Sequence, residues 1–516
     1  MPTVTATIAI EANLGAGWVN VRADTLLGVE PAEAEYGIRG GGALDRVAST
    51  GTLSFAMNND TTNSAGLAGY YTPGHANVRV GWEIGIPIRL AITYAGTTYY
   101  KFRGTLVSVQ PDAGQYGRAA VLCVAHDWMD EAAIAFVKDT AVQINQRSDQ
   151  LINTIVTQTI GRQPAATSYA TGKSTFAFAM DNLSDVRTRA LRALADVVMA
   201  EVGYLYVKGD TTQGGTLTFE DRHARQTASL AATFTETMYA LDAVRTRDDI
   251  QNHVVAMVHP RKLDAAATTV LYELTPTETT PALAPGETKA LSVFYREASG
   301  RYVRIGGDSI VTPVASTDYL GNSQADGLGV NLTSSLSLVF ASTSNSATLT
   351  FTNNHASSTI YLTLLQVRGK ALQDRYELAV EAEDAASISA YGEHDLVYDM
   401  IFEDRENVAK DIANWFISLY GSPVLSVSTI AIHANQTPTL MTQALAREPG
   451  DKIALTESLT AQSARTHFIN GVRLSVRAGD ILDVAWTLAP AGQVDAWILG
   501  TVGRSELGTT TILGFG

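Results

Sequence analysis

Two short stretches of this sequence are nearly the same. One is FRGTLVSV, residues Phe102–Val109, and the other is FINGVRLSV, residues Phe468–Val476. Both alternate apolar and polar residues, which is typical of a β-strand with one buried face. A glycine turn precedes each stretch, in GWEI at Gly81 and in GDKI at Gly450. The recurrence of one strand pattern near both ends of the chain predicts two similar β-domains.

The two stretches are aligned here on their phenylalanines, Phe102 and Phe468, which are then expected to occupy matching places. Ser108-Val109 matches Ser475-Val476 after a slip of one residue. A further strand containing a tryptophan is expected after each stretch. Because strands share a small vocabulary of residues, a chance likeness between two hairpins is the alternative interpretation. The residues that this comparison selects as structural or interface candidates are Phe102, Gly104, Phe468, Gly471, Trp128 and Trp486.

Composition narrows the class of protein. Of 516 residues, 46% are hydrophobic, which indicates a folded chain, and only 17% are charged. The net charge of −15 and the absence of any lysine- or arginine-rich run disfavour binding of nucleic acid. A single cysteine, Cys123, excludes an intrachain disulfide. With no signal-peptide pattern and no apolar run of membrane-spanning length, we expect a soluble protein made in a reducing cytoplasm.

Turn residues and hydrophobic periodicity divide the chain into segments. The fold class that they predict is mainly β with α+β parts, in several domains: two similar β-barrels, a small α+β domain and an inserted β-sandwich. Helices are predicted over 148–161, 184–203 and 407–420. The expected domains are a first barrel (1–134), an α+β domain (135–240), strands returning to the first barrel (241–279), an inserted sandwich (280–372), a connector with a helix (373–423) and a second barrel (424–516).

Three polar or glycine-rich clusters could carry chemistry, and each has a structural interpretation that we favour. The glycines of RGGGA, 39–43, lead toward a strand and not a phosphate-binding helix, so a loop is expected. The run His126–Glu131 is expected to cap a helix at a domain boundary, with a metal site as the alternative. In Glu220–His223 successive side chains point to opposite faces of a strand, so ion pairing with Arg222 is expected. No catalytic, cofactor-binding or metal-binding residue is predicted, and the protein is not expected to be an enzyme or to need a cofactor.

Several longer stretches together resemble the baseplate hub, or tail-tip hub, proteins of tailed bacteriophages. They are GTLSFAMNND (51–60), the helix and hairpin LRALADVVMAEVGYLYVKGDTTQGGTLTFEDRHAR (191–225), the run from LTFTNN (349–354) to GEHDL (392–396), and the closing WILGTVGRSELGTTTILGF (497–515). Trp497, which opens the last stretch, is a further structural candidate.

The resemblance implies that the two β-barrels are of the tube type, and that the chain forms a homotrimer that closes the tail tube as a ring of approximate six-fold symmetry. Its partners would be the distal tail protein, the tape measure protein and a central tail fibre or spike. DNA would pass through the channel without specific binding. The protein would be part of the virion, at the tail tip, and would assemble in the host cytoplasm. The alternative is a receptor- or carbohydrate-binding tail protein that uses the inserted sandwich.

Overall fold

A computed structural model describes most of the chain. The described residues are 4–113, 118–137, 140–181, 188–275, 278–296, 305–374, 377–423, 425–491, 495–496 and 511–512. The prediction of a mainly β chain of several domains with α+β parts is confirmed. Trp497 and most of the closing stretch 497–515 lie outside the described residues.

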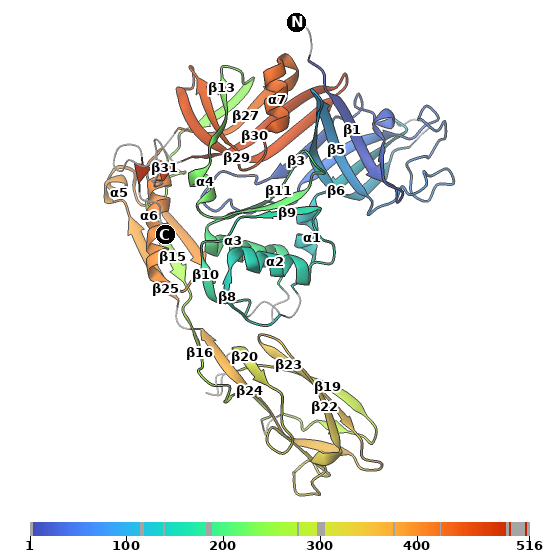
Figure 1. The fold of residues 1–516 in the computed structure, drawn as a ribbon, viewed down its shortest axis with the longest axis vertical. Helices are drawn as coiled ribbons and strands as arrows, with labels where there is room; N and C mark the ends of the chain where they lie inside the picture. The colour runs from blue at the N-terminus through green and yellow to red at the C-terminus, as the bar shows by residue number, and fades with distance from the viewer. Residues whose placement is uncertain are drawn as a thin grey trace.

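The largest element is one sheet of 13 strands, at the top of Figure 1. Its first six-stranded part, here the first array, has the order β1-β5-β6-β7-β4-β3, with the short β2 (Trp18–Asn20) outside β1. The strands of the first array are β1 (Thr7–Asn13), β3 (Ala32–Gly37), β4 (Thr52–Asn58), β5 (Pro87–Tyr94), β6 (Thr97–Pro111) and β7 (Ala120–His126). Alternate residues of these strands, such as Ile8 and Ile10, are buried in one apolar core.

The remaining strands of the sheet form the second array, with the order β13-β28-β29-β30-β27-β14. They are β13 (Leu230–Thr235), β14 (Ala240–Val244), β27 (Ser426–His433), β28 (Lys452–Glu457), β29 (Gln462–Arg477) and β30 (Ile481–Pro490). Helix α7 (Pro438–Ala446) adds Leu440, Met441, Ala444 and Leu445 to the same apolar core. Its first turn is stabilised by the Thr437 side chain, which accepts a hydrogen bond from the backbone N–H of Leu440.

The two arrays share one strand order. β6 and β29 are the third strands, each hydrogen-bonded to the preceding hairpin strand (β5 or β28) on one side and to the following strand (β7 or β30) on the other. The outer pairs differ in direction, because β1 is antiparallel to β5 whereas β13 is parallel to β28. The arrays meet where β29 also pairs with β3, so that one continuous sheet holds both.

An α+β unit lies below the large sheet in Figure 1, with helices α2 and α3 beneath the strands β9 and β11. Its elements are α1 (Trp128–Ile134), β8 (Gln143–Arg147), α2 (Ser148–Thr159), β9 (Ala166–Tyr169), β10 (Thr175–Ala179), α3 (Ala190–Glu201), β11 (Tyr204–Lys208), β12 (Thr216–Glu220) and α4 (Ala224–Thr227). The predicted helical faces are buried as expected: Leu151, Ile152, Ile155 and Val156 of α2 pack in the same core as Leu194, Val197 and Val198 of α3.

A third unit is a three-stranded sheet with one helix on it. Its order is β25-β15-β26, from β15 (His253–Val258), β25 (Leu378–Glu383) and β26 (Asp395–Met400). Helix α6 (Glu406–Tyr420) buries Val408, Ile412 and Phe416 against one face of this sheet. The short helix α5 (Ala385–Tyr391) connects β25 to β26.

The inserted sandwich projects from the body at the bottom of Figure 1. Its long strand β24 (Ile360–Asp374) pairs with β16 (Arg261–Leu263), β17 (Thr269–Glu273), β18 (Ala282–Leu283), β20 (Gly306–Val311) and β21 (Tyr319–Asn322). A second sheet of order β19-β23-β22 covers it, from β19 (Thr288–Phe294), β22 (Leu336–Ser342) and β23 (Ser346–Asn353). The chain enters and leaves the insert on paired strands, since Arg261 lies opposite Asp374.

Three domain expectations differ from these pairings. Residues 241–279 do not return to the first array: β14 pairs with β27 of the second array, and β15 pairs with β25 and β26. The segment 230–235, expected in the α+β domain, pairs with β28. The insert begins at β16, earlier than residue 280. The reason is the same in each case: alternation identifies a strand but not its partner, which is chosen by packing far away in the sequence.

None of the helices in the described ranges is both long and apolar enough to cross a membrane.

Candidate functional site: the joint between the two arrays

The seam between the arrays is made by β29 and β3, with Gly471 opposite Gly37. Neither position has room for a side chain. A Cβ on Gly471 would lie 2.7 Å from the backbone oxygen of Ile38, and one on Gly37 would lie 2.5 Å from that of Asn470. Gly37 also has a φ of +92°, a conformation that side chains disfavour. The two glycines therefore let the strands that join the arrays approach closely.

A buried ion pair links three segments beside this seam. The Lys101 ammonium of β6 contacts the Glu448 carboxylate, and it also donates to the backbone oxygens of Leu445 and Arg447 at 2.9 and 3.0 Å. The same carboxylate accepts a hydrogen bond from the Tyr36 hydroxyl of β3 at 3.0 Å and another from the backbone N–H of Gly209 at 3.0 Å. Glu448 thus connects the first array, the second array and the hairpin of the α+β unit.

Burial and charge act in opposite directions on this group. Burial raises the pKa of the Glu448 carboxyl above its ordinary value, and the neighbouring Lys101 ammonium opposes that rise. The side chain of Lys101 is fully buried, so each charge of the pair depends on the other.

A second anchor attaches the α+β unit to β29. The Arg225 guanidinium donates to Glu220 at 3.0 Å and to the Asn470 side-chain oxygen at 2.7 Å. It also stacks over the Tyr204 ring, with 3.4 Å between the guanidinium carbon and the ring centroid. Asn470 in turn donates to the backbone oxygen of Gly40 at 2.5 Å. Residues next to the seam therefore also hold the unit beneath it.

The two phenylalanines of the repeated stretch lie on corresponding strands but in different surroundings. Phe102 belongs to the apolar core of the sheet, whereas Phe468, also buried, is outside that cluster and its ring contacts Arg225. The next residue, Ile469, is the one that enters the core. The expectation that Phe102 and Phe468 occupy matching places does not hold for their side chains.

The glycines provide the better match. Aligning Gly104 with Gly471 removes the slip between Ser108 and Ser475 and places Phe102 beside Ile469. Gly104, like Gly471, lies where a backbone approaches, because a Cβ there would be 2.1 Å from the oxygen of His126. Register irregularities at different points of β6 and β29 shift the alternation by one residue, which is how a β-bulge misleads a sequence alignment.

The tryptophans are structural and not equivalent. Trp128 starts helix α1, where its indole N–H donates to the backbone oxygen of Arg162 at 2.9 Å, and it is buried in the core of the α+β unit. Trp486 is on strand β30, fully buried, with its ring 5.2 Å from that of Phe234. Because Phe102, Phe468, Trp128 and Trp486 are all buried within one chain, these side chains are not exposed for contact with another subunit.

The three clusters weighed from the sequence have structural roles. Gly42 lies in a loop, where its N–H donates to Asp45 at 2.8 Å. Asp127 caps α1 by accepting from the N–H of Met129 at 3.0 Å, and burial raises its pKa to about 7. The ion pairing expected for Arg222 is formed at 3.4 Å with Glu201 of α3.

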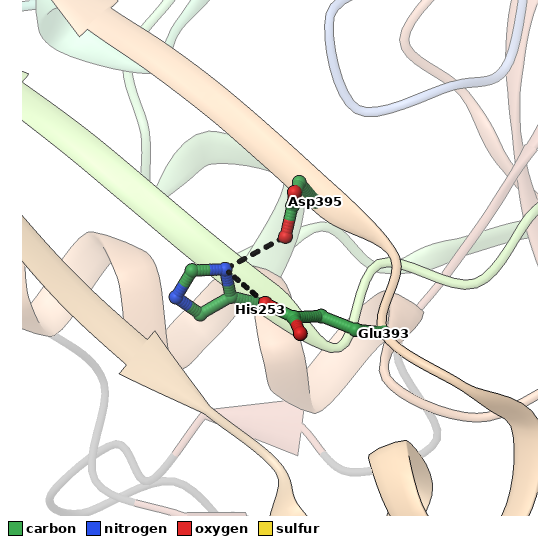
Figure 2. Close-up of side chains that lie close together, drawn as sticks. All are labelled: His253, Glu393 and Asp395. Carbon is green, nitrogen blue, oxygen red and sulfur yellow. Dashed lines mark hydrogen bonds and ion pairs between the residues drawn. The ribbon is translucent and has the colours of Figure 1, made fainter.

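One histidine–carboxylate cluster could not be found from local sequence. His253 of β15 lies beside Asp395 of β26 and Glu393 of the preceding loop, as Figure 2 shows. The ring Nδ1 is 2.7 Å from the Asp395 carboxylate and 3.5 Å from that of Glu393. The hydrogen bond to Asp395 raises the pKa of His253 above its ordinary value. The residues are 142 positions apart, and only the parallel pairing of β15 with β26 brings them together.

The geometry of this cluster is that of a hydrogen bond. Its three possible ligand atoms lie within 4.8 Å of one another, and one nitrogen with two carboxylate oxygens is a set that zinc accepts. Two tetrahedral zinc ligands at ~2.0 Å, however, are about 3.3 Å apart. The separation of 2.7 Å between His253 and Asp395 is shorter, as in a charge-assisted hydrogen bond.

Comparison with known proteins shows that this chain is similar in fold to several solved structures. No protein-family model and no curated protein matches the chain. The tail protein from Neisseria meningitidis MC58 is 9% identical, with a TM-score of 0.48 over 94% of this chain and 97% of that one. The 43 kDa tail protein of prophage MuSo2 from Shewanella oneidensis is 9% identical, with a TM-score of 0.49 over 94% and 99%. Prophage tail protein gp18 from Listeria monocytogenes EGD-e is 7% identical, with a TM-score of 0.37 over 93% and 94%.

Proposed function

We propose that this protein is a structural hub of a phage-type tail, in which one chain supplies two similar subunits of a ring. The repeated strand order within one continuous sheet is the observation that supports the proposal. Three such chains around an axis would place six similar arrays in a ring of approximate six-fold symmetry. A ring of this kind joins a six-fold tube to a three-fold fibre. The strand pairing at Gly471 and the contacts of Glu448 support the proposal, because they would hold the two arrays of each chain in one orientation.

The partners follow from that position. The ring would contact the distal tail protein on one side and a central fibre or spike on the other, with the end of the tape measure protein inside it. DNA would pass through its channel, and a chain of net charge −15 gives phosphates little to bind. The protein would act at the tail tip of the virion after assembly in the host cytoplasm, without an enzymatic step.

Mass photometry and electron-microscopy class averages of the purified chain test the proposal. The expected particle has three times the chain mass of 55.0 kDa and appears end-on as a ring with six similar lobes around a pore. A monomer, or an elongated trimer without a ring, would contradict it.

A second candidate function is receptor binding by the insert. The outward side chains of β23 are the uncharged Ser346, Thr348, Thr350 and Thr352, and this sheet lies on a domain that projects from the body. An uncharged outer sheet face on a projecting domain favours a contact surface. Binding of the full chain on a glycan array, lost in a Thr350→Lys variant, would support this role; equal signals from both proteins would reject it.

A further inference from the structure

The sheet β25-β15-β26 has one covered and one open face. Val254, Ala256 and Val258 of β15 are buried in the core that α6 shares. Because side chains alternate along a strand, His253, Val255 and Met257 point to the opposite side. Their neighbours in register are Glu383, Glu381 and Ala379 on β25 and Asp395, Val397 and Asp399 on β26. We call this open side, with the flanking Glu377 and Glu393, the acidic face.

Carboxylates surround the acidic face. They are Glu377, Glu381, Glu383, Glu393, Asp395 and Asp399. The side chains of Glu381 and Asp399 are 64% and 55% exposed, so more than half of each is in contact with water. The ion-pair contacts of this group are with two histidines: His253 with Glu381, Glu393 and Asp395, and His259 with Glu377 and Asp399. The carboxylates of β25 and β26 lie on the two sides of β15, and a cationic partner would lower the repulsion among them.

The centre of the acidic face is apolar. Val255 lies between Glu381 and Val397 in register, and Met257 lies between Ala379 and Asp399. Val397 is 60% exposed, which is a high value for a valine on a strand whose other side is buried in a core. An apolar centre inside a charged rim is the usual anatomy of a protein-binding surface.

The charge of the face selects the kind of partner. A second copy of this chain is a poor match, because the chain has 52 acidic against 37 basic residues and no lysine- or arginine-rich run. Nucleic acid and anionic lipid would be repelled for the same reason. A protein segment that alternates apolar residues with lysine or arginine would match both the centre and the rim.

We propose that the acidic face is a docking surface for a different protein that presents a lysine- and arginine-rich amphipathic segment. The apolar side chains of that segment pack on Val255, Met257 and Val397, and its cations pair with the surrounding carboxylates. This proposal does not depend on ring formation, because the face belongs to a single chain.

The test uses the full chain and two synthetic peptides of about ten residues, one alternating lysine with valine and one alternating lysine with serine. Binding is measured by calorimetry at low and at physiological salt. The lysine–valine peptide is expected to bind, more weakly as salt rises. The lysine–serine peptide is expected to bind at least several-fold more weakly, since it cannot use the apolar centre. Equal affinity for the two peptides, or no binding of the first, would overturn the proposal.

Matched variants locate the binding. The variant Glu381→Gln/Asp395→Asn/Asp399→Asn removes three rim charges, and about tenfold weaker binding of the lysine–valine peptide is expected. Val397→Ser should weaken binding without changing charge. The control Glu273→Gln/Glu287→Gln/Asp326→Asn removes three exposed carboxylates of the insert and should leave affinity within about twofold. An equal loss in both triple variants would show attraction to net charge alone and would reject the docking surface.

Discussion

At the scale of single residues, the joint between the two arrays requires a residue without a side chain at Gly471. In the β29–β3 seam, the backbone oxygen of Ile38 lies so close to Gly471 that it leaves no room for a methyl group on this residue. The φ of Gly471 is not in the left-handed region, so the effect of a substitution there is steric. The cost of an alanine therefore reports how closely the two arrays are held together.

We expect Gly471→Ala to lower the free energy of unfolding by about 1–3 kcal/mol, because the new Cβ forces the strands apart. Chemical denaturation followed by tryptophan fluorescence measures this. Gly161→Ala is the control, since a Cβ at Gly161 meets nothing within 4 Å. Equal stability of the two variants would show that the seam accommodates a side chain.

A second prediction at this scale concerns pH. Since Asp395 raises the pKa of His253, the folded protein binds that proton more tightly than the unfolded chain does. The resulting stabilisation is complete below the ordinary histidine pKa of about 6.5 and is lost as pH rises through the higher folded value. An NMR titration should give a pKa above 6.5 for His253 and a lower one in Asp395→Asn. No change in that variant would contradict the assigned cause.

At the scale of elements, one carboxylate connects three segments that the sequence keeps far apart. Glu448 follows α7, Lys101 lies on β6, 347 residues earlier, and Gly209 follows β11. These contacts link the large sheet to the α+β unit, and each of these two parts has an apolar core of its own. Polar contacts at such a boundary fix relative orientation, which apolar packing alone leaves less specific.

We expect Glu448→Gln to destabilise the protein by about 3–5 kcal/mol, because it leaves the Lys101 ammonium buried without a carboxylate. The double variant Lys101→Met/Glu448→Gln should lose less than the sum of the two single changes, because no buried charge then remains unpaired. Denaturation midpoints of the four proteins form the double-mutant cycle. Additive losses would show that the two groups do not interact.

At the scale of the whole molecule, the chain enters and leaves the insert at neighbouring positions. β16 and the end of β24 are paired, so the chain leaves the body and returns to it side by side. Among the described residues, contacts to the α+β unit lie close to this base: Arg261 pairs with Asp181 at 3.0 Å and donates to the backbone oxygen of Phe178 at 3.2 Å, and the Ser344 N–H donates to the backbone oxygen of Thr140 at 2.9 Å. The insert has its own apolar core, around Phe351 and Leu362.

Replacing residues 264–371 by a short glycine–serine turn should therefore leave the rest of the protein folded, with a thermal midpoint close to that of the full chain. Circular dichroism and calorimetry check this, and Arg261 is kept so that its pair with Asp181 survives. Aggregation or loss of the main transition would show that the body needs the insert.

Some of this architecture could be read from the sequence. Alternation and turn residues identified most strands, and helical periodicity located α2, α3 and α6. The likeness between the stretches at 102–109 and 468–476 led to two strands that hold the same place in two arrays. Composition also indicated a mainly β protein. All of these features depend on residues within a few positions of one another, and such short-range patterns are what a sequence displays directly.

Only the tertiary structure decided which strands are partners and what the polar residues contact. β14 joins the second array, Phe468 points away from the core that Phe102 enters, and His253 meets Asp395 across 142 residues. A strand's pattern says which side is buried but is compatible with many partners, and one bulge reverses the side. Those choices depend on packing between segments that are far apart in the sequence, such as the pairing of β3 with β29 at Gly37 and Gly471. The free energy of such contacts cannot be judged from either segment alone.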